Sequence, residues 1–163
     1  MRLHAILGQS RLHLATAIIA LDWEKIFLYG SDKKQFEDLK EGVIRLIKSH
    51  PELSETPAHA LSKKIELIKI PSLDRNKNDM LSMIRELRKS LKGMKGEIDN
   101  SDALFYSGTK PHLSLFVIER GFERILSFRD DSLQMHINTL EVGKPKIHAV
   151  QFNRTVPEWA VES

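Results

Sequence analysis

Short apolar segments that alternate with helical segments constrain the fold of this chain more than any other feature of its sequence. Segments with the length and composition of strands cover residues 2–7, 25–29, 64–70 and 103–106. Apolar residues recur at helical spacing over residues 12–21, 33–49, 79–92 and 111–120. This alternation predicts an α/β fold in which helices flank a mostly parallel sheet.

The C-terminal part of the chain is expected to be a short β-rich section. Its three predicted strands cover residues 124–128, 133–140 and 146–152. We therefore expect one ligand-binding domain over residues 1–152. Residues 153–163 have no clear pattern and are interpreted as a tail or as a linker toward an effector domain.

Local signals refine two of the segments. Asp32 is a suitable N-cap for the helix over 33–49. The inward face of that helix is predicted to carry Phe36, Leu39, Val43, Leu46 and Ile47. Residues 50–62 contain two prolines and lack periodicity, so they are predicted to be mainly a loop.

Composition limits the cellular location that we expect for the chain and the metals or cofactors that it could bind. The chain has no cysteine, which removes disulfides, thiolate catalysis and cysteine-bound zinc, and its seven histidines lack metal-ligand spacing. Neither a metal nor a cofactor is expected. The absence of an apolar run of about eighteen residues argues against a membrane span. A strand directly after Met1-Arg2 leaves no room for a signal peptide, so a cytoplasmic location is expected.

The charge balance argues against duplex DNA as a direct partner. The formal net charge is +3, from 25 basic and 22 acidic residues, with no concentrated basic stripe. This mild excess is compatible with a small polyanionic ligand held at one place.

Small polar turns follow three of the predicted strands. They are Gly8-Gln9-Ser10-Arg11, Gly30-Ser31-Asp32 and Ser107-Gly108-Thr109-Lys110. In a parallel sheet such turns meet at the carboxyl edge, where ligands bind. Amide groups at a strand–turn–helix junction bind anions, most often phosphate, and Lys110 adds a full positive charge. The alternative is that these are ordinary connections, since glycine and serine are common in turns.

Familiar phosphate-binding fingerprints are absent from these turns. Gly8 is not followed by the further glycines of a dinucleotide-binding turn. The Ser107–Lys110 turn lacks the earlier glycine and the Lys-then-Ser/Thr order of a P-loop. An ATPase or a nicotinamide-dependent enzyme is therefore disfavoured.

Residues 104–110, Leu-Phe-Tyr-Ser-Gly-Thr-Lys, resemble the Thr-Gly-Gly-Thr-Lys turn of CARF (CRISPR-associated Rossmann fold) domains. The Gly8–Arg11 turn resembles that family's other ligand-binding turn, and the order of elements fits over roughly residues 1–150. The resemblance implies a Rossmann-like fold and a two-fold homodimer. It also implies binding of cyclic oligoadenylate, the ring-shaped second messenger of type III CRISPR antiviral defence. A ring of four or six nucleotides would lie across the dimer axis.

By this resemblance, Ser10 and Arg11 would meet ribose or phosphate. Gly108, Thr109 and Lys110 would hold phosphate. The remaining expected ligand-binding residues are those of the same turns: Gly8, Gln9, Gly30, Ser31, Tyr106 and Ser107.

This chain departs from the family pattern at two positions. Ser107 replaces the first glycine of the second turn, which limits how closely the backbone approaches a phosphate. Tyr106 replaces the leading threonine. Its ring either stacks on adenine or packs in the core, and both interpretations stay open.

Three functions follow as alternatives. The first is a sensor domain of a type III CRISPR ancillary effector. The second is a metal-independent ring nuclease in which a ribose 2′-hydroxyl attacks its own phosphate. Because family members that cut the ring rely on a serine and a lysine at these positions, Ser10 and Lys110 would be the catalytic residues. The third is the regulatory domain of a transcription factor whose nucleic-acid-binding part lies elsewhere.

Overall fold

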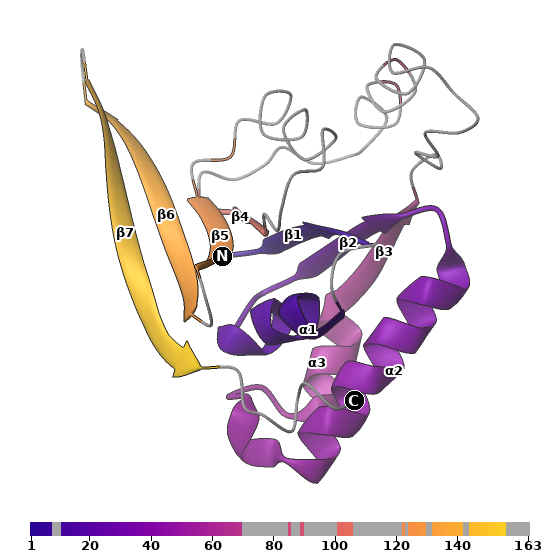
Figure 1. Cartoon of the computed structure of the whole chain (residues 1–163). Coiled ribbons are helices and arrows are strands. Elements are labelled where there is room, and N and C mark those ends of the chain that lie inside the picture. The colour runs from indigo at the N-terminus through magenta and orange to yellow at the C-terminus, as the bar shows by residue number, and fades with distance from the viewer. Residues whose placement is uncertain are drawn as a thin grey trace.

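The computed structural model describes residues 1–7, 11–69, 85, 89, 101–105, 122, 124–129, 132–141 and 144–155. Its strands form one seven-stranded sheet in the order β3-β2-β1-β4-β5-β6-β7 (Figure 1). The strands are β1 (Leu3–Ile6), β2 (Ile26–Gly30), β3 (Ile65–Lys69), β4 (Ala103–Phe105), β5 (Arg124–Arg129), β6 (Ser132–Glu141) and β7 (Lys144–Thr155).

The sheet has a parallel part and an antiparallel part. Strands β3, β2, β1, β4 and β5 are parallel neighbours, whereas β6 and β7 are antiparallel. From β1 the chain moves outward to β2 and β3, and it then returns to the other side of β1 as β4. The fold is therefore α/β and Rossmann-like with a C-terminal β-rich section, as predicted.

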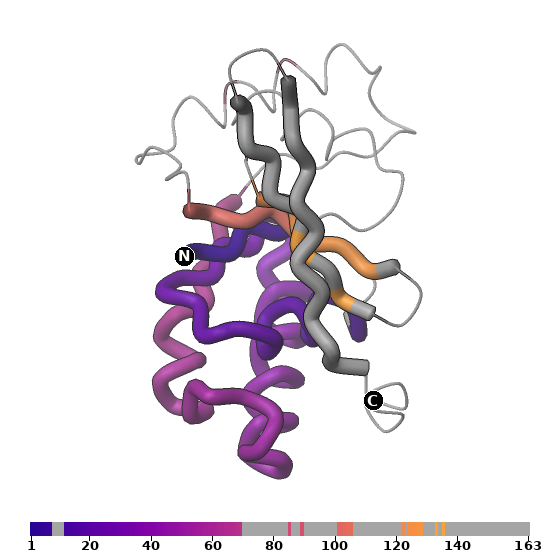
Figure 2. The backbone as a smooth tube through the Cα atoms, turned by 90° about the vertical axis from the view of Figure 1, so that its left-hand side faces the viewer, coloured from indigo at the N-terminus to yellow at the C-terminus, as the bar shows by residue number. Residues whose placement is uncertain are grey.

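The described helices cover one face of the sheet (Figure 2). They are α1 (Arg11–Ala20), α2 (Lys33–Ser49), the 3-10 helix η1 (Pro51–Leu53) and α3 (Ala58–Lys64). Alternation along β1 determines which side chains meet them, because successive strand residues point to opposite faces. Leu3 and Ala5 join the core beneath the sheet, and His4 and Ile6 belong to the other face.

The core explains why α1 is so apolar. Leu14 and Ile18 are buried within this chain, and the Trp23 indole nitrogen donates a hydrogen bond of 2.9 Å to the carbonyl oxygen of Ala17. This burial accounts for the apolar run that the sequence shows between residues 12 and 21.

Residues 50–62 were predicted to be mainly a loop, and that prediction is wrong. They contain η1 and most of α3, which begins after Pro57 and buries Leu61. A seven-residue helix offers only two turns, too few to show periodicity. Proline is compatible with the start of a helix, so Pro57 precedes this one rather than excluding it.

The other boundaries are close to those predicted. β7 continues through Thr155, past the predicted end of the domain at 152. Arg85 and Lys89 are helical and exposed, in agreement with a helix over 79–92, and the rest of that helix lies outside the described residues. The predicted helix over 111–120 also lies outside them.

Candidate functional site

The carboxyl edge of the parallel strands is where the predicted turns originate. Strands β2, β1 and β4 are adjacent and parallel, with Ile6 opposite Tyr29 and His4 opposite Leu104. The three turns therefore begin from neighbouring strands at one edge. The strand order reverses between β1 and β4, and such a switch point is where open α/β sheets bind ligands.

Most of the predicted ligand-binding residues lie outside the described part of the chain. This holds for Gly8, Gln9, Ser10, Tyr106, Ser107, Gly108, Thr109 and Lys110. Arg11 is described in its backbone only and is the first residue of α1. Gly30 ends β2 and is buried, and Ser31 follows it and is exposed.

Gly30 has a packing role that the sequence did not reveal. A Cβ at this position would lie 2.6 Å from Leu7 Cδ1 and 3.0 Å from Leu7 Cβ. The Leu7 amide also donates a hydrogen bond of 2.8 Å to the carbonyl oxygen of Tyr29. The end of β2 is therefore held tightly against the residue that follows β1.

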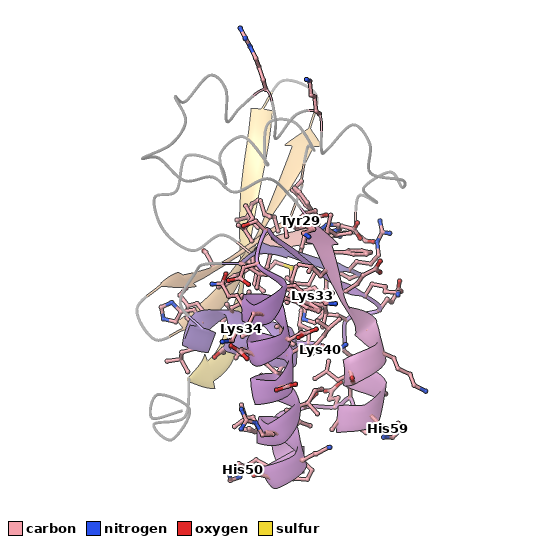
Figure 3. The ribbon with its side chains drawn as sticks, turned by 90° about the vertical axis from the view of Figure 1, so that its right-hand side faces the viewer. Tyr29, Lys33, Lys34, Lys40, His50 and His59 are labelled. Atoms are coloured by element: carbon pink, nitrogen blue, oxygen red, sulfur yellow. The ribbon has the colours of Figure 1, made fainter. Side chains whose placement is uncertain are left out.

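The start of α2 is at the same edge. Asp32 is its N-cap, as predicted, and its side chain accepts hydrogen bonds from the amides of Lys34 and Gln35. The first turn of α2 contains Lys33 and Lys34 and no acidic residue. Figure 3 shows Tyr29 at this end of α2, and His50 and His59 at the far ends of α2 and α3.

A buried polar network lies across β2, β1 and the start of β4, on the face opposite the helices. Arg2 and Asp102 form its charged part. Arg2 Nε donates to Asp102 Oδ1 at 2.9 Å, and Arg2 Nη2 donates to Asp102 Oδ2 at 2.6 Å. The Asp102 side chain is 0% exposed, and the Arg2 side chain is 28% exposed. The guanidinium also lies 5.7 Å from the centre of the Phe27 ring, within cation–π range.

His4 continues the network toward β2. Its Nε2 lies 3.0 Å from Asp102 Oδ2, and its Nδ1 lies 2.7 Å from the Tyr29 hydroxyl oxygen. Since an ionised carboxylate only accepts hydrogen bonds, Nε2 carries the proton. In the neutral ring Nδ1 is then an acceptor, and the Tyr29 hydroxyl donates to it. We name the set Arg2, His4, Tyr29 and Asp102 the switch-point network.

Aromatic rings enclose the imidazole. Its centroid lies 5.1 Å from those of Phe27 and Phe122 and 5.9 Å from that of Tyr29. His4 is 3% exposed and Tyr29 is 4% exposed. Because these rings exclude water from the hydrogen bonds of His4, breaking either bond costs more free energy than it would at the surface.

Opposing effects act on the pKa of Asp102. Burial raises it, and the hydrogen bonds from Arg2 and His4, together with the positive charge of Arg2, lower it by more, so the pKa lies below its ordinary value of 3.8. Asp102 is therefore ionised at neutral pH and accepts hydrogen bonds from both partners. This state supports the His4 tautomer assigned above.

Sequence reasoning placed His4 in a strand but did not identify the switch-point network. Asp102 is 98 positions from His4, and Tyr29 is 25 positions from it, so no local pattern connects them. The available signals were a histidine inside an otherwise apolar strand and an aspartate directly before another.

The described residues include neither a candidate metal site nor a candidate membrane span. No group of three or more His, Asp or Glu side chains there is arranged to hold a metal ion. Among the described helices, none has the length and apolar character needed to cross a membrane.

The fold and the edge described above define a Rossmann-like α/β domain with a candidate ligand site at its switch point. No family model matches the chain, and no curated protein matches it. Among solved structures it is similar to protein VC1899 from Vibrio cholerae, with a TM-score of 0.46 and 18% identity over 89% of this chain. This chain spans 35% of that protein's chain.

A second similar structure is a domain described as a putative precorrin-6Y C5,15-methyltransferase from Corynebacterium diphtheriae. Its TM-score is 0.40, with 10% identity over 91% of this chain and 81% of the other.

Proposed function

We propose that this chain binds cyclic oligoadenylate at a homodimer interface, as the sensor domain of a cytoplasmic type III CRISPR ancillary effector. The observation that carries the proposal is the parallel pairing of β1 with β4. Because of that pairing, the Gly8–Arg11 and Ser107–Lys110 turns originate from neighbouring strands on the two sides of the switch point. This is the arrangement that the resemblance to CARF domains requires.

The two described helices that begin at this edge favour an anion there. Unpaired amides and the helix dipole make a helix N-terminus electropositive, so acidic residues are usually favoured in its first turn. The first turn of α1 contains no acidic residue. That of α2 contains two lysines, and the Asp32 carboxylate already accepts hydrogen bonds from two of its amides. An anionic ligand at the edge would therefore be attracted chiefly by the N-terminus of α1 and by the two lysines.

Each turn has a separate role in the proposal. Ser10 and Arg11 contact ribose or phosphate, and Gly108, Thr109 and Lys110 hold a phosphodiester. The turn after β2 completes the edge through Ser31. Ligand binding then changes the relative placement of the two subunits, which an attached effector domain senses.

Calorimetry with cyclic tetra-adenylate and with cyclic hexa-adenylate tests the proposal. The wild-type chain is expected to bind one of these rings, and Lys110→Ala is expected to weaken binding by about ten- to a hundredfold, since one charge-assisted hydrogen bond is lost. Lys48→Ala is the matched control, because Lys48 is exposed in the last turn of α2, away from the edge. Absence of heat and of thermal stabilisation with both rings would refute the proposal.

Chromatography of the same mixtures in the presence of a chelator decides whether the ring is also cut. Ser10 and Lys110 are the residues on which a ring nuclease would depend. Linear products that disappear in Ser10→Ala and in Lys110→Ala would assign cleavage to this chain. Intact ring after prolonged incubation would leave it a sensor only.

A further inference from the structure

The switch-point network has no part in the function proposed above, yet it connects the same three strands. Tyr29 is in β2, His4 is in β1, and Asp102 directly precedes β4. Its hydrogen bonds therefore join the three strands whose carboxyl ends lead into the predicted ligand-binding turns.

The network is close to those turns along the chain. Tyr29 directly precedes Gly30 and Ser31. The Leu7 amide, which immediately precedes the first turn, donates to the Tyr29 carbonyl oxygen at 2.8 Å. Gly30 packs so closely on Leu7 that a Cβ would be 2.6 Å from Leu7 Cδ1. A displacement of Tyr29 would therefore be transmitted to the ends of both β1 and β2.

Hydrogen bonds in the network allow little freedom in the relative position of the strands. The 2.7 Å contact between Tyr29 and His4 and the 3.0 Å contact between His4 and Asp102 each need a specific orientation of the ring. Both are buried, so a shifted strand would lose hydrogen bonds in an environment from which water is excluded. An apolar contact would tolerate the same shift, because dispersion and hydrophobic contacts are not directional.

We infer that His4 and Tyr29 are positioning residues of the ligand-binding edge. Together with the ion pair of Asp102 and Arg2, their hydrogen bonds fix β2 and β4 against β1 so that the three turns reach the same ring. The inference rests on the proposed function and adds to it a set of residues that do not touch the ligand.

Tyr29→Phe is the principal test, because it removes one hydroxyl and keeps the buried ring. We expect the dissociation constant for the bound ring, cyclic tetra- or hexa-adenylate, to rise by up to about tenfold, the limit reached when the whole free energy of the lost hydrogen bond holds the edge in its binding arrangement. It is measured at a temperature where every variant is fully folded. Amide hydrogen exchange at Leu7 is expected to become faster in the absence of ligand. Arg2→Lys, at the exposed end of the network, is expected to change both quantities in the same direction.

Thr56→Val is the matched control, because it also removes a hydroxyl that joins two distant segments. Thr56 Oγ1 donates to Asp22 Oδ1 at 2.6 Å, in the connections that precede α3 and β2. This variant is expected to lower the unfolding midpoint without changing ring affinity or exchange at Leu7. A merely structural role for Tyr29 would make the two variants behave alike.

Unchanged ring affinity together with unchanged exchange at Leu7 in Tyr29→Phe would overturn the inference and leave the proposed function intact. If the wild-type chain binds neither ring, the proposed function fails. Exchange at Leu7 then still decides the positioning role: faster exchange in Tyr29→Phe supports it, and unchanged exchange refutes it.

Discussion

The carboxylate of Asp102 contributes stability that the folded domain loses at acid pH. Its pKa in the folded chain lies below the ordinary value of 3.8. A lowered pKa means that the ionised form stabilises the folded state above the ordinary pKa. This stabilisation is lost as the pH falls from there through the lower pKa of the folded state.

Asp102→Asn is expected to destabilise the domain at neutral pH by about 2 kcal/mol, because the buried ion pair with Arg2 loses one charge. Below the ordinary pKa of the carboxyl group the difference from wild type should shrink. Unfolding midpoints measured from neutral pH to pH values below that pKa check this. Glu37→Gln, which changes an exposed carboxylate of α2, is the control. Parallel pH curves for wild type and Asp102→Asn would contradict the assignment.

Gly30 is expected to tolerate no side chain, for reasons of packing. Gly30→Ala would place a methyl group within 3.0 Å of both Cδ1 and Cβ of Leu7, and the Cβ cannot move aside without the backbone. We expect a loss of about 1–3 kcal/mol, the usual range for overpacking.

A double-mutant cycle with Leu7→Ala checks this explanation. Leu7→Ala removes the Cγ and Cδ atoms, so it should relieve part of the strain caused by Gly30→Ala. The combined loss in denaturant unfolding is therefore expected to be smaller than the sum of the two single losses. Additive losses would mean that the steric explanation is wrong.

At the scale of elements, the two residues that precede α2 are expected to have separate roles. Asp32 stabilises the helix as its N-cap, and Ser31 is expected to contact the ligand. The Asp32 side chain accepts from the Lys34 amide at 2.9 Å and from the Gln35 amide at 3.3 Å. Asp32→Ala is expected to cost about 1 kcal/mol, the usual value of an N-cap. Thermal and urea unfolding measure it.

Ser31→Ala is the comparison for that prediction. Ser31 is exposed, so its loss should leave the unfolding midpoint unchanged and weaken ring binding if Ser31 contacts the ligand. An equal loss of stability in both variants would contradict the assignment of the cap to Asp32.

The elements that the sequence predicted correctly are those whose signals are local. α2 combines an N-cap with buried Phe36, Leu39, Val43 and Ile47 at helical spacing, and its bounds were predicted correctly. β1, β2 and β4 are short apolar segments next to polar turns. α3 was missed because one buried leucine in seven residues makes no periodic pattern.

The switch-point network was missed for a different reason. Its hydrogen bonds form only after the topology has brought β1 between β2 and β4. The sequence contains the four residue types but not their juxtaposition, which depends on the return of the chain from β3 to β4. Polar residues in buried strands are therefore informative only when strand order is known.

At the scale of the whole molecule, the strand order determines which predicted turns begin at the same edge of the sheet. β1 lies inside the sheet, between β2, which follows it along the chain, and β4, to which the chain returns after β3. Turns on the two sides of β1 therefore share one edge. In the function proposed above, a second copy of the chain meets the ligand at this edge with the same turns.

Two-fold symmetry makes a prediction about stoichiometry that follows from the proposed function. A ring of four or six nucleotides presents equivalent phosphates on both sides of its own two-fold axis, so each of two chains meets it with the same residues. We expect calorimetry to give one ring per two chains, and sedimentation to show a dimer at saturating ring. Lys110→Ala should weaken binding without changing this ratio, because both copies lose the same contact. One ring per chain, with a monomer in sedimentation, would contradict a shared site and favour a ligand that each edge holds by itself.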